Sequence, residues 1–206
     1  MTPSPYYYQS LYRSTKVEWD AYRRWTDFLP RRTTEPYHSG PHSVRCLRAA
    51  YEMVRPSSVL EIGFNLGHSS VIWLELGVAR VVSVEVRDDK KVRDAGELIA
   101  ARYPNRFELT IREPGAVLIP LARYDLTFID GSHERKDVCE DIWRAVMLDI
   151  PWLLLDDYDT GHGPGVVEAV RECGLIPVAI FGTMALCRSG RLFTMTSDPL
   201  GLNYYE

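Results

Sequence analysis

The sequence predicts an α/β fold with a central, mostly parallel sheet covered by helices on both faces. After Pro56, short apolar runs alternate with longer amphipathic segments, and such alternation is typical of parallel strands joined by helical crossovers. The runs are apolar at nearly every position, as expected of strands buried between two layers of helices. The sheet therefore begins after Pro56.

Six strands are expected, one for each apolar run: 58–63, 80–86, 106–111, 124–130, 151–157 and 176–181. The expected helices between them are 68–76, 88–102, 134–148 and 164–172, with Gly77, Pro104 and Gly174 as stop signals. On the third helix Val138 and Ile142 share one face with Ala145 and Val146, while acidic residues, including Asp137, Glu140 and Asp141, occupy the rest. This pattern predicts a surface helix lying on a sheet.

Two further regions flank this core. Residues 16–30 and 45–54 can each form an amphipathic helix, and the end of the chain favours an antiparallel hairpin around Ser189-Gly190. We therefore expect an N-terminal helical extension over residues 1–38 and one α/β domain over residues 39–206. The tyrosine-rich start, with Tyr6, Tyr7, Tyr8 and Tyr12, could form a lid over a substrate or the face of a homodimer.

Composition narrows the class of protein. A chain of 206 residues can bury a sufficient core without disulfides, and its net charge of −4 gives no general attraction for nucleic acid or anionic membranes. Only the first 55 residues are basic, with nine Lys/Arg against five Asp/Glu. The four cysteines form no CxxC pair, and no apolar run approaches the ~20 residues of a membrane span. We expect a cytoplasmic protein in a reducing compartment.

Acidic residues and glycines gather where the expected strands end. In an open parallel sheet, ligands bind beyond the carboxyl ends of the strands. Gly63 and Gly67 would let the chain turn tightly and bring backbone N–H groups of the next helix towards a ligand, although such a turn could also serve packing alone. Glu85 ends the second strand, where an acid can accept hydrogen bonds from both hydroxyls of a ribose. Alternatively, it could be a solvated acid that pairs with Arg87.

The segments "VLEIGFNLGHSS" and "VVSVEV" resemble the first two motifs of class I S-adenosylmethionine (SAM)-dependent methyltransferases, in particular the small metal-dependent O-methyltransferases of the catechol type. The resemblance covers residues 39–188 and implies a Rossmann-like methyltransferase fold. It implies that Gly63 and Asn65 contact the methionine part of SAM, that Ser69 binds its carboxylate and that Glu85 holds the ribose. The residues assigned to the cofactor are Glu61, Gly63, Asn65, Gly67, Ser69, Glu85, Gly115, Ala116 and Asp130.

The segment "EPGAVLIPL" resembles the third motif of that family, in which Gly115 and Ala116 border the adenine. The sequence departs from the family at Val117, where a polar residue is usual. It also lacks the Pro-Gly-Gly turn before the fifth expected strand. These departures leave open a SAM-binding module without catalytic activity.

Three carboxylates, Asp130, Asp156 and Asp157, follow two neighbouring strands. Clustered carboxylates repel one another unless a cation compensates, and oxygen ligands suit a hard ion such as Mg²⁺ or Ca²⁺. The family resemblance also assigns these three positions to a divalent cation. Alternatively, Asp156 or Asp157 could cap a turn and Asp130 could accept N–H bonds within its loop.

His133 is the expected general base, with Asp130 beside it as the second catalytic residue. Related methyltransferases that act on antibiotic sugars often have a DG-x-H segment here, and a histidine can accept a proton near neutral pH. Its alternative role is to cap the helix that begins at Glu134. His162 lies on a glycine-flanked loop that could close over a substrate.

The leading hypothesis is methyl transfer from SAM to a hydroxyl of a small molecule, assisted by a divalent cation. An enzyme that methylates exocyclic amines of bases would be expected to carry an Asn/Asp-Pro-Pro-Tyr type of motif, and the fourth strand ends in "IDGSH" instead. O-methylation of a tRNA modification is compatible with this ending. The sequence does not indicate the acceptor.

Overall fold

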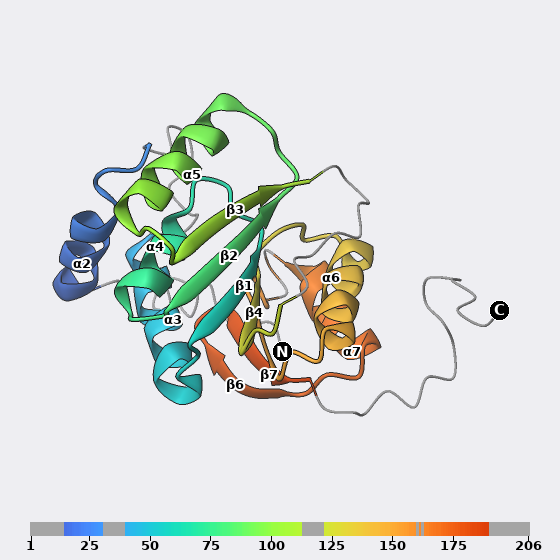
Figure 1. Ribbon diagram of the computed structural model, residues 1–206. Coiled ribbons are helices and arrows are strands. Elements are labelled where there is room, and N and C mark those ends of the chain that lie inside the picture. The colour runs from blue at the N-terminus through green and yellow to red at the C-terminus, as the bar shows by residue number, and fades with distance from the viewer. Residues whose placement is uncertain (1–14, 31–39, 113–121, 160, 162, 190–206) are drawn as a thin grey trace.

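The protein is built around a seven-stranded sheet in the order β3-β2-β1-β4-β5-β7-β6 (Figure 1). This computed structural model describes residues 15–30, 40–112, 122–159, 161 and 163–189. Among the described strands, only β7 is antiparallel to both of its neighbours. The strands are β1 (Ser58–Ile62), β2 (Arg80–Glu85), β3 (Phe107–Ile111), β4 (Leu126–Ile129), β5 (Trp152–Leu155), β6 (Pro177–Phe181) and β7 (Met184–Arg188).

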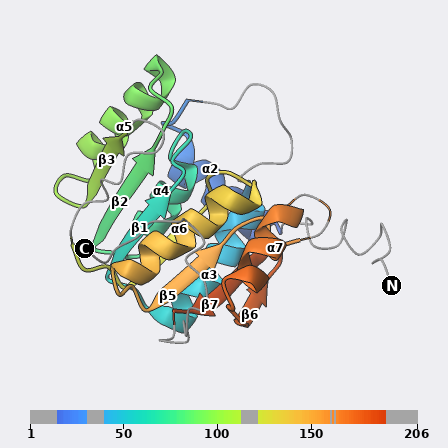
Figure 2. The same ribbon diagram turned by 90° about the vertical axis from the view of Figure 1, so that its right-hand side faces the viewer.

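Helices cover both faces of the sheet, as predicted (Figure 2). One face carries α2 (Lys16–Thr26), α3 (Pro41–Val54), α4 (His68–Glu75) and α5 (Lys90–Arg102), and the other carries α6 (Arg135–Met147) and α7 (Pro164–Glu172). Alternate residues of each central strand supply the two apolar cores. Val59 of β1 packs with α2–α5, and its neighbour Leu60 packs with α6 and α7, because successive strand residues point to opposite faces.

An antiparallel hairpin is present near the C-terminal end of the described chain. The chain turns at Gly182-Thr183 between β6 and β7. The hairpin expected around Ser189-Gly190 has its second arm outside the described residues and stays a prediction. The run 176–181 is the first arm of the β6–β7 hairpin, and Gly182 has a φ of +62°, which favours glycine at such a turn. Residues 190–206 lie outside the described part of the chain.

The helix α2, within the expected N-terminal extension, packs against α3 and α4. Thr15 caps it, because its hydroxyl accepts from the Glu18 N–H at 3.3 Å while the Glu18 carboxylate accepts from the Thr15 N–H. The ring of Tyr22 stacks on His68, the first residue of α4, with centroids 5.8 Å apart. None of the described helices is long and apolar enough to cross a membrane. The domain boundary at residue 38 stays a prediction.

Backbone hydrogen bonds continue the sheet beyond its strands and align their carboxyl ends. Gly63 N–H donates to Val84 O at 2.9 Å, and Asp130 N–H donates to Ile62 O at 2.8 Å. The approach of β1 to β4 is close enough that a Cβ on Gly63 would lie 2.1 Å from Asp130 O. Gly63 also has a φ of +95°. Only glycine fits here, for reasons of both space and backbone conformation.

The substitution Gly63→Ala should therefore lower the free energy of unfolding by about 3 kcal/mol or more, from the steric overlap and the positive φ together. The matched control is Gly174→Ala, since Gly174 has a φ of +66° but its Cβ would meet no other atom within 4 Å. The control should lose about 1–2 kcal/mol. Urea unfolding measures both changes, and equal losses at the two positions would contradict a steric role for Gly63.

Candidate functional site

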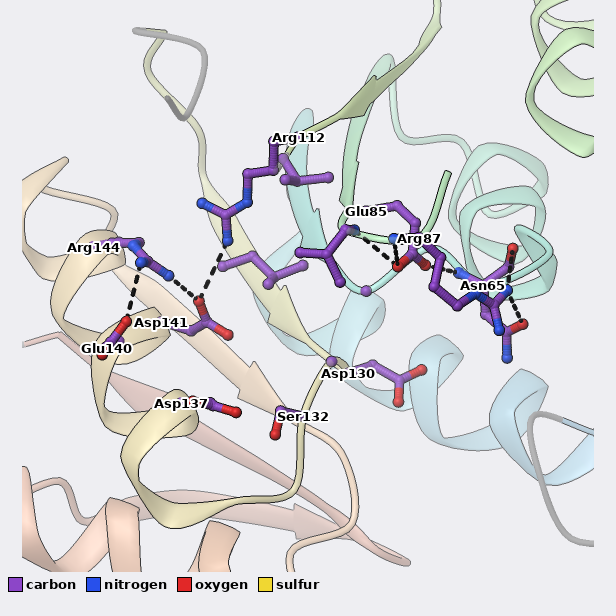
Figure 3. A pocket seen from close by; sticks show the side chains of 15 residues that line it. Asn65, Glu85, Arg87, Arg112, Asp130, Ser132, Asp137, Glu140, Asp141 and Arg144 are labelled. Atoms are coloured by element: carbon purple, nitrogen blue, oxygen red, sulfur yellow. Dashed lines mark hydrogen bonds and ion pairs between the residues drawn. The ribbon is translucent and has the colours of Figure 1, made fainter. Parts of the chain in front are cut away.

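A cavity of about 480 Å³ opens at the carboxyl ends of the strands (Figure 3). Its floor comes from the ends of β1, β2 and β4, and one wall comes from α6. Residues from the predicted cofactor segments line it together with several charged residues. The lining residues are Ile62, Gly63, Asn65, Val84, Glu85, Val86, Arg87, Arg112, Asp130, Gly131, Ser132, Asp137, Glu140, Asp141 and Arg144.

Glu85 organises the backbone around this cavity. Its Oε2 accepts from the N–H groups of Phe64 and Asn65 at 3.2 and 2.7 Å. Its Oε1 accepts from the N–H groups of Val86 and Arg87 at 2.9 and 3.0 Å. The residue is only 8% exposed, so the alternative of a solvated acid is wrong. One carboxylate thus ties the turn after β1 to the end of β2.

Arg87 and Asn65 lie side by side at the rim of the cavity. The Arg87 guanidinium donates to Asn65 Oδ1 at 3.1 Å and approaches Asp89 Oδ2 to 3.6 Å. Asn65 has a φ of +51°, which asparagine tolerates better than most residues. The side chain of Arg87 therefore pairs with these two residues and not with Glu85.

Glu61 lies in the interior and does not line the cavity, although we had assigned it to the cofactor. Its carboxylate accepts hydrogen bonds from the hydroxyls of Ser70 and Ser83 and is fully buried. Burial raises the pKa of Glu61, against the effect of hydrogen bonds from Ser69, Ser70 and Ser83. Ser69 is itself buried on the first turn of α4. The group holds α4 against β1 and β2.

Gly67 is the last residue before α4 and has a φ of +74°. A Cβ there would lie 2.4 Å from Ile99 Cδ1 and 2.5 Å from the Phe64 ring. The tight-packing alternative therefore holds for Gly67, while Gly63 both packs closely and lines the cavity.

His133 and two acids meet next to the cavity. His133 Nε2 lies 3.0 Å from Asp157 Oδ2, and the ligand atoms of Asp130, His133 and Asp157 all lie within 4.8 Å of one another. The helix-capping alternative for His133 is not what the structure has, because the hydroxyl of Ser132 accepts from Glu134 N–H at 3.1 Å. Asp130 belongs both to this cluster and to the cavity lining.

Two glycines of the segment "GHGPG" let α7 approach the histidine cluster. A Cβ on Gly165 would lie 2.3 Å from His133 O, and one on Gly163 would lie 2.0 Å from Asp157 O. The sequence predicted a glycine-flanked loop at His162 that could close over a substrate, and it did not indicate this packing role for Gly163 and Gly165. In the structure they allow the backbone of His133 and that of Asp157 to pack on the start of α7.

Asp156 does not join Asp130 and Asp157, which corrects the predicted trio of metal ligands. Its Oδ1 accepts from Asp157 N–H at 2.8 Å and from Thr183 Oγ1–H at 3.2 Å. Burial and the charge of Asp157 raise the pKa of Asp156 to about 7. The alternative in which an aspartate caps a turn therefore applies to Asp156, and His133 occupies the third place in the cluster.

A network of ion pairs on α6 was missed by sequence reasoning. Arg144 donates to Asp141 Oδ1 at 2.8 Å and to Glu140 Oε2 at 3.1 Å, and Arg112 Nη2 approaches Asp141 Oδ1 to 3.9 Å. We expected the acidic face of this helix to be solvated, but Asp141 is 6% exposed. The signal was present in the spacing of Asp137, Glu140, Asp141 and Arg144, which places them on one face.

Several predicted residues lie outside the described part of the chain: Gly115, Ala116, Val117, His162 and the N-terminal tyrosines. Their assignments stay predictions. The four cysteines are buried and free.

Comparison with known proteins identifies the fold. The sequence matches no protein-family model and no curated protein. Among solved structures, the methyltransferase PaMTH1 of Podospora anserina with bound S-adenosylhomocysteine (SAH) has a TM-score of 0.63 and 14% identity, over 91% of this chain and 97% of that one. The O-methyltransferase TomG of Streptomyces achromogenes, in complex with SAM, has a TM-score of 0.51 and 19% identity, over 90% and 95%.

A third similar structure is the 1,6-didemethyltoxoflavin-N1-methyltransferase of Burkholderia thailandensis, with a TM-score of 0.56 and 16% identity over 91% of each chain. These similarities confirm the predicted Rossmann-like fold of class I SAM-dependent methyltransferases. Because O- and N-methyltransferases share it, the fold does not fix the acceptor atom.

The raised pKa of Glu61 predicts a pH-dependent stability. The native state keeps a proton that the unfolded chain releases at about pH 4.3, so the free energy of unfolding should fall as pH rises from there to the native pKa. Glu61→Gln removes this titration and should gain stability relative to wild type as pH rises. Urea unfolding at about pH 5, 6.5 and 8 measures this difference, with Glu168→Gln on the surface of α7 as control. Parallel pH profiles of wild type and Glu61→Gln would contradict the assignment.

Proposed function

We propose that the chain transfers a methyl group from SAM to a hydroxyl group of a small molecule. The observation that carries the proposal is the double position of Asp130, which lines the 480 Å³ cavity and also belongs to the cluster with His133 and Asp157. A cofactor in this cavity would have a proton acceptor beside one end. The methyltransferase fold of the chain supports the assignment of the cavity to SAM.

The cavity offers distinct contacts to the parts of SAM. Gly63 and Asn65 would border the methionine part, and Glu85 would accept from the ribose hydroxyls. A carboxylate has about four lone-pair sites, and four backbone N–H groups already use those of Glu85. Binding of both hydroxyls would therefore replace or share some of these bonds.

His133 would act as the general base. When Nε2–H donates to Asp157 Oδ2, Nδ1 carries the lone pair that accepts the hydroxyl proton. The acceptor oxygen then bonds to the methyl carbon as the carbon–sulfur bond breaks, and the sulfonium becomes the neutral thioether of SAH. Asp157 orients the imidazole and stabilises its protonated form.

The donor set at this cluster fits a divalent cation. Two carboxylates and one imidazole lie within 4.8 Å of one another. Carboxylate oxygens suit Mg²⁺ and Mn²⁺, and an imidazole suits softer divalent ions. We include Asp130 and Asp157 as its ligands, with His133 close by. When bound, such a cation would lower the pKa of a coordinated hydroxyl.

The direct test is formation of SAH from SAM with catechols, glycosides and tRNA as acceptors, beside calorimetric binding of SAH. With an acceptor that the wild-type protein methylates, His133→Gln should lower turnover about 10²–10⁴-fold, the usual contribution of a positioned base. The variant should also lose the increase of rate with pH, while its affinity for SAH should hardly change. Glu134→Gln on the same exposed loop is the control and should keep wild-type turnover. An unchanged pH profile in His133→Gln would remove the residue from the reaction.

The proposed cation site predicts that aspartate variants will differ in their affinity for a divalent ion. Titration of the protein with Mn²⁺ or Mg²⁺ should show binding that Asp130→Asn and Asp157→Asn each weaken about 10-fold or more, because each removes a charged ligand. Asp156→Asn is the matched control, since the Asp156 carboxylate pairs with Thr183, and it should bind the ion as wild type does. If all three variants lose affinity for the ion equally, the three ligands predicted from sequence are correct. If the wild-type protein binds no ion, the cation site is wrong and the His133–Asp157 pair would act without a metal.

A further inference from the structure

Five charged side chains form the wall of the cavity on the α6 side: Arg112, Asp137, Glu140, Asp141 and Arg144 (Figure 3). Arg144 bridges Asp141 and Glu140, and Arg112, which follows β3, approaches Asp141 from the sheet. The other oxygen of Asp141, Oδ2, lies 3.9 Å from the position of a Cβ on Gly131, at the cavity floor. Two arginines and three acids thus form this wall.

This wall has an energetic cost that stability alone does not explain. The side chains of Arg112 and Asp141 are only 9% and 8% exposed. Burial raises the pKa of Asp141, against the charges of Arg144 and Arg112, and burial lowers the pKa of Arg112, an effect that Arg144 increases. Buried ion pairs can often be replaced by apolar residues at no loss of stability. Their position on a cavity wall points instead to a ligand.

The position of the wall identifies which part of a ligand would meet it. Along the sheet edge, Asp130 follows β4, Glu85 ends β2 and Arg112 follows β3. A cofactor with its reacting sulfur near Asp130 and its ribose at Glu85 has its base beyond the ribose. Arg112 lines the cavity on this side of Glu85, and Asp141 Oδ1 of α6 lies 3.9 Å from the Arg112 guanidinium.

We propose that Asp141 and Arg112 recognise the polar edge of adenine, an assignment that rests on the proposed binding of SAM. Adenine presents an amino donor next to a ring-nitrogen acceptor. The wall offers matching partners for both groups: the Asp141 carboxylate can accept from the amino group, and the Arg112 guanidinium can donate to the ring nitrogen. The nearest atoms of these two side chains are 3.9 Å apart. Val117, in the segment expected to border the base, has no side-chain group that could form such a bond.

The test compares SAH with S-inosylhomocysteine, in which an oxo group replaces the adenine amino group and the neighbouring ring nitrogen carries a hydrogen. The Asp141 carboxylate accepts from the amino group but repels the oxo oxygen, and the Arg112 guanidinium donates to the bare ring nitrogen of adenine but not to the N–H of the analogue. Wild-type protein should therefore bind SAH about 10–100-fold more tightly than the oxo analogue, the range expected for one specific base contact. Calorimetry gives both dissociation constants.

Asp141→Asn should reduce this preference about 10-fold or more, because an amide can donate to the oxo group as well as accept from the amino group. The matched control is Glu140→Gln, the neighbouring acid that pairs with Arg144. It should keep the wild-type preference, with any loss of affinity equal for both ligands.

The outcomes separate this proposal from the one on which it rests. Wild-type protein that binds neither ligand contradicts the proposed function. Wild-type protein that binds both equally, or an unchanged preference in Asp141→Asn, overturns the adenine assignment alone. If Asp141→Asn does not fold, Arg112→Lys replaces it, since lysine keeps the charge but lacks the planar fork of donors. A reduced preference in that variant supports the assignment, and an unchanged one overturns it.

Discussion

The close contact between Gly63 and the backbone of Asp130 is the constraint on which the site depends. It lets the carboxyl ends of β1 and β4 lie together, with Asp130 N–H bonded to Ile62 O. A side chain at position 63 would displace the loop that carries both Asp130 and His133. The glycine therefore fixes the floor of the cavity and the position of the cluster at the same time.

The acids gathered at this edge are stabilised in different ways, and this difference divides their roles. Glu61 is held by serine hydroxyls in the interior, and Glu85 by four backbone N–H groups. Asp141 is paired with arginine, and Asp157 with His133. Glu61 secures α4 against the sheet, and Glu85 secures the backbone around the cavity. Asp141 lines the cavity and Asp157 lies beside it in the cluster with Asp130 and His133, which is why the proposed base recognition and proton transfer are assigned to these two acids.

The alternation of apolar runs and amphipathic segments predicted most of the fold between residues 56 and 181. This pattern is clear because the strands are buried on both faces and the helices that connect them are amphipathic. It did not predict the turn at Gly182, since that turn depends on β7 inserting beside β5, a pairing that local sequence does not encode. The acidic face of α6 was misread for a similar reason. A charged helical face looks solvated until a second segment, here Arg112, is known to cover it.

The same limit explains why the trio of metal ligands predicted from sequence does not come together in the structure. Asp156 and Asp157 are consecutive, and consecutive residues at a strand end point to opposite sides. Asp157 also adopts a φ of +51°, which turns the chain and directs its carboxylate to His133, while the carboxylate of Asp156 stays with Thr183. Two adjacent acids thus serve two sides of the sheet. A proposed cation at Asp130 and Asp157 would have an imidazole beside it in place of a third carboxylate, and imidazole is a ligand that softer divalent ions accept more readily than Mg²⁺ does. The positive φ of Asp157 thus decides which of the two adjacent acids faces the histidine and could join a proposed ion site.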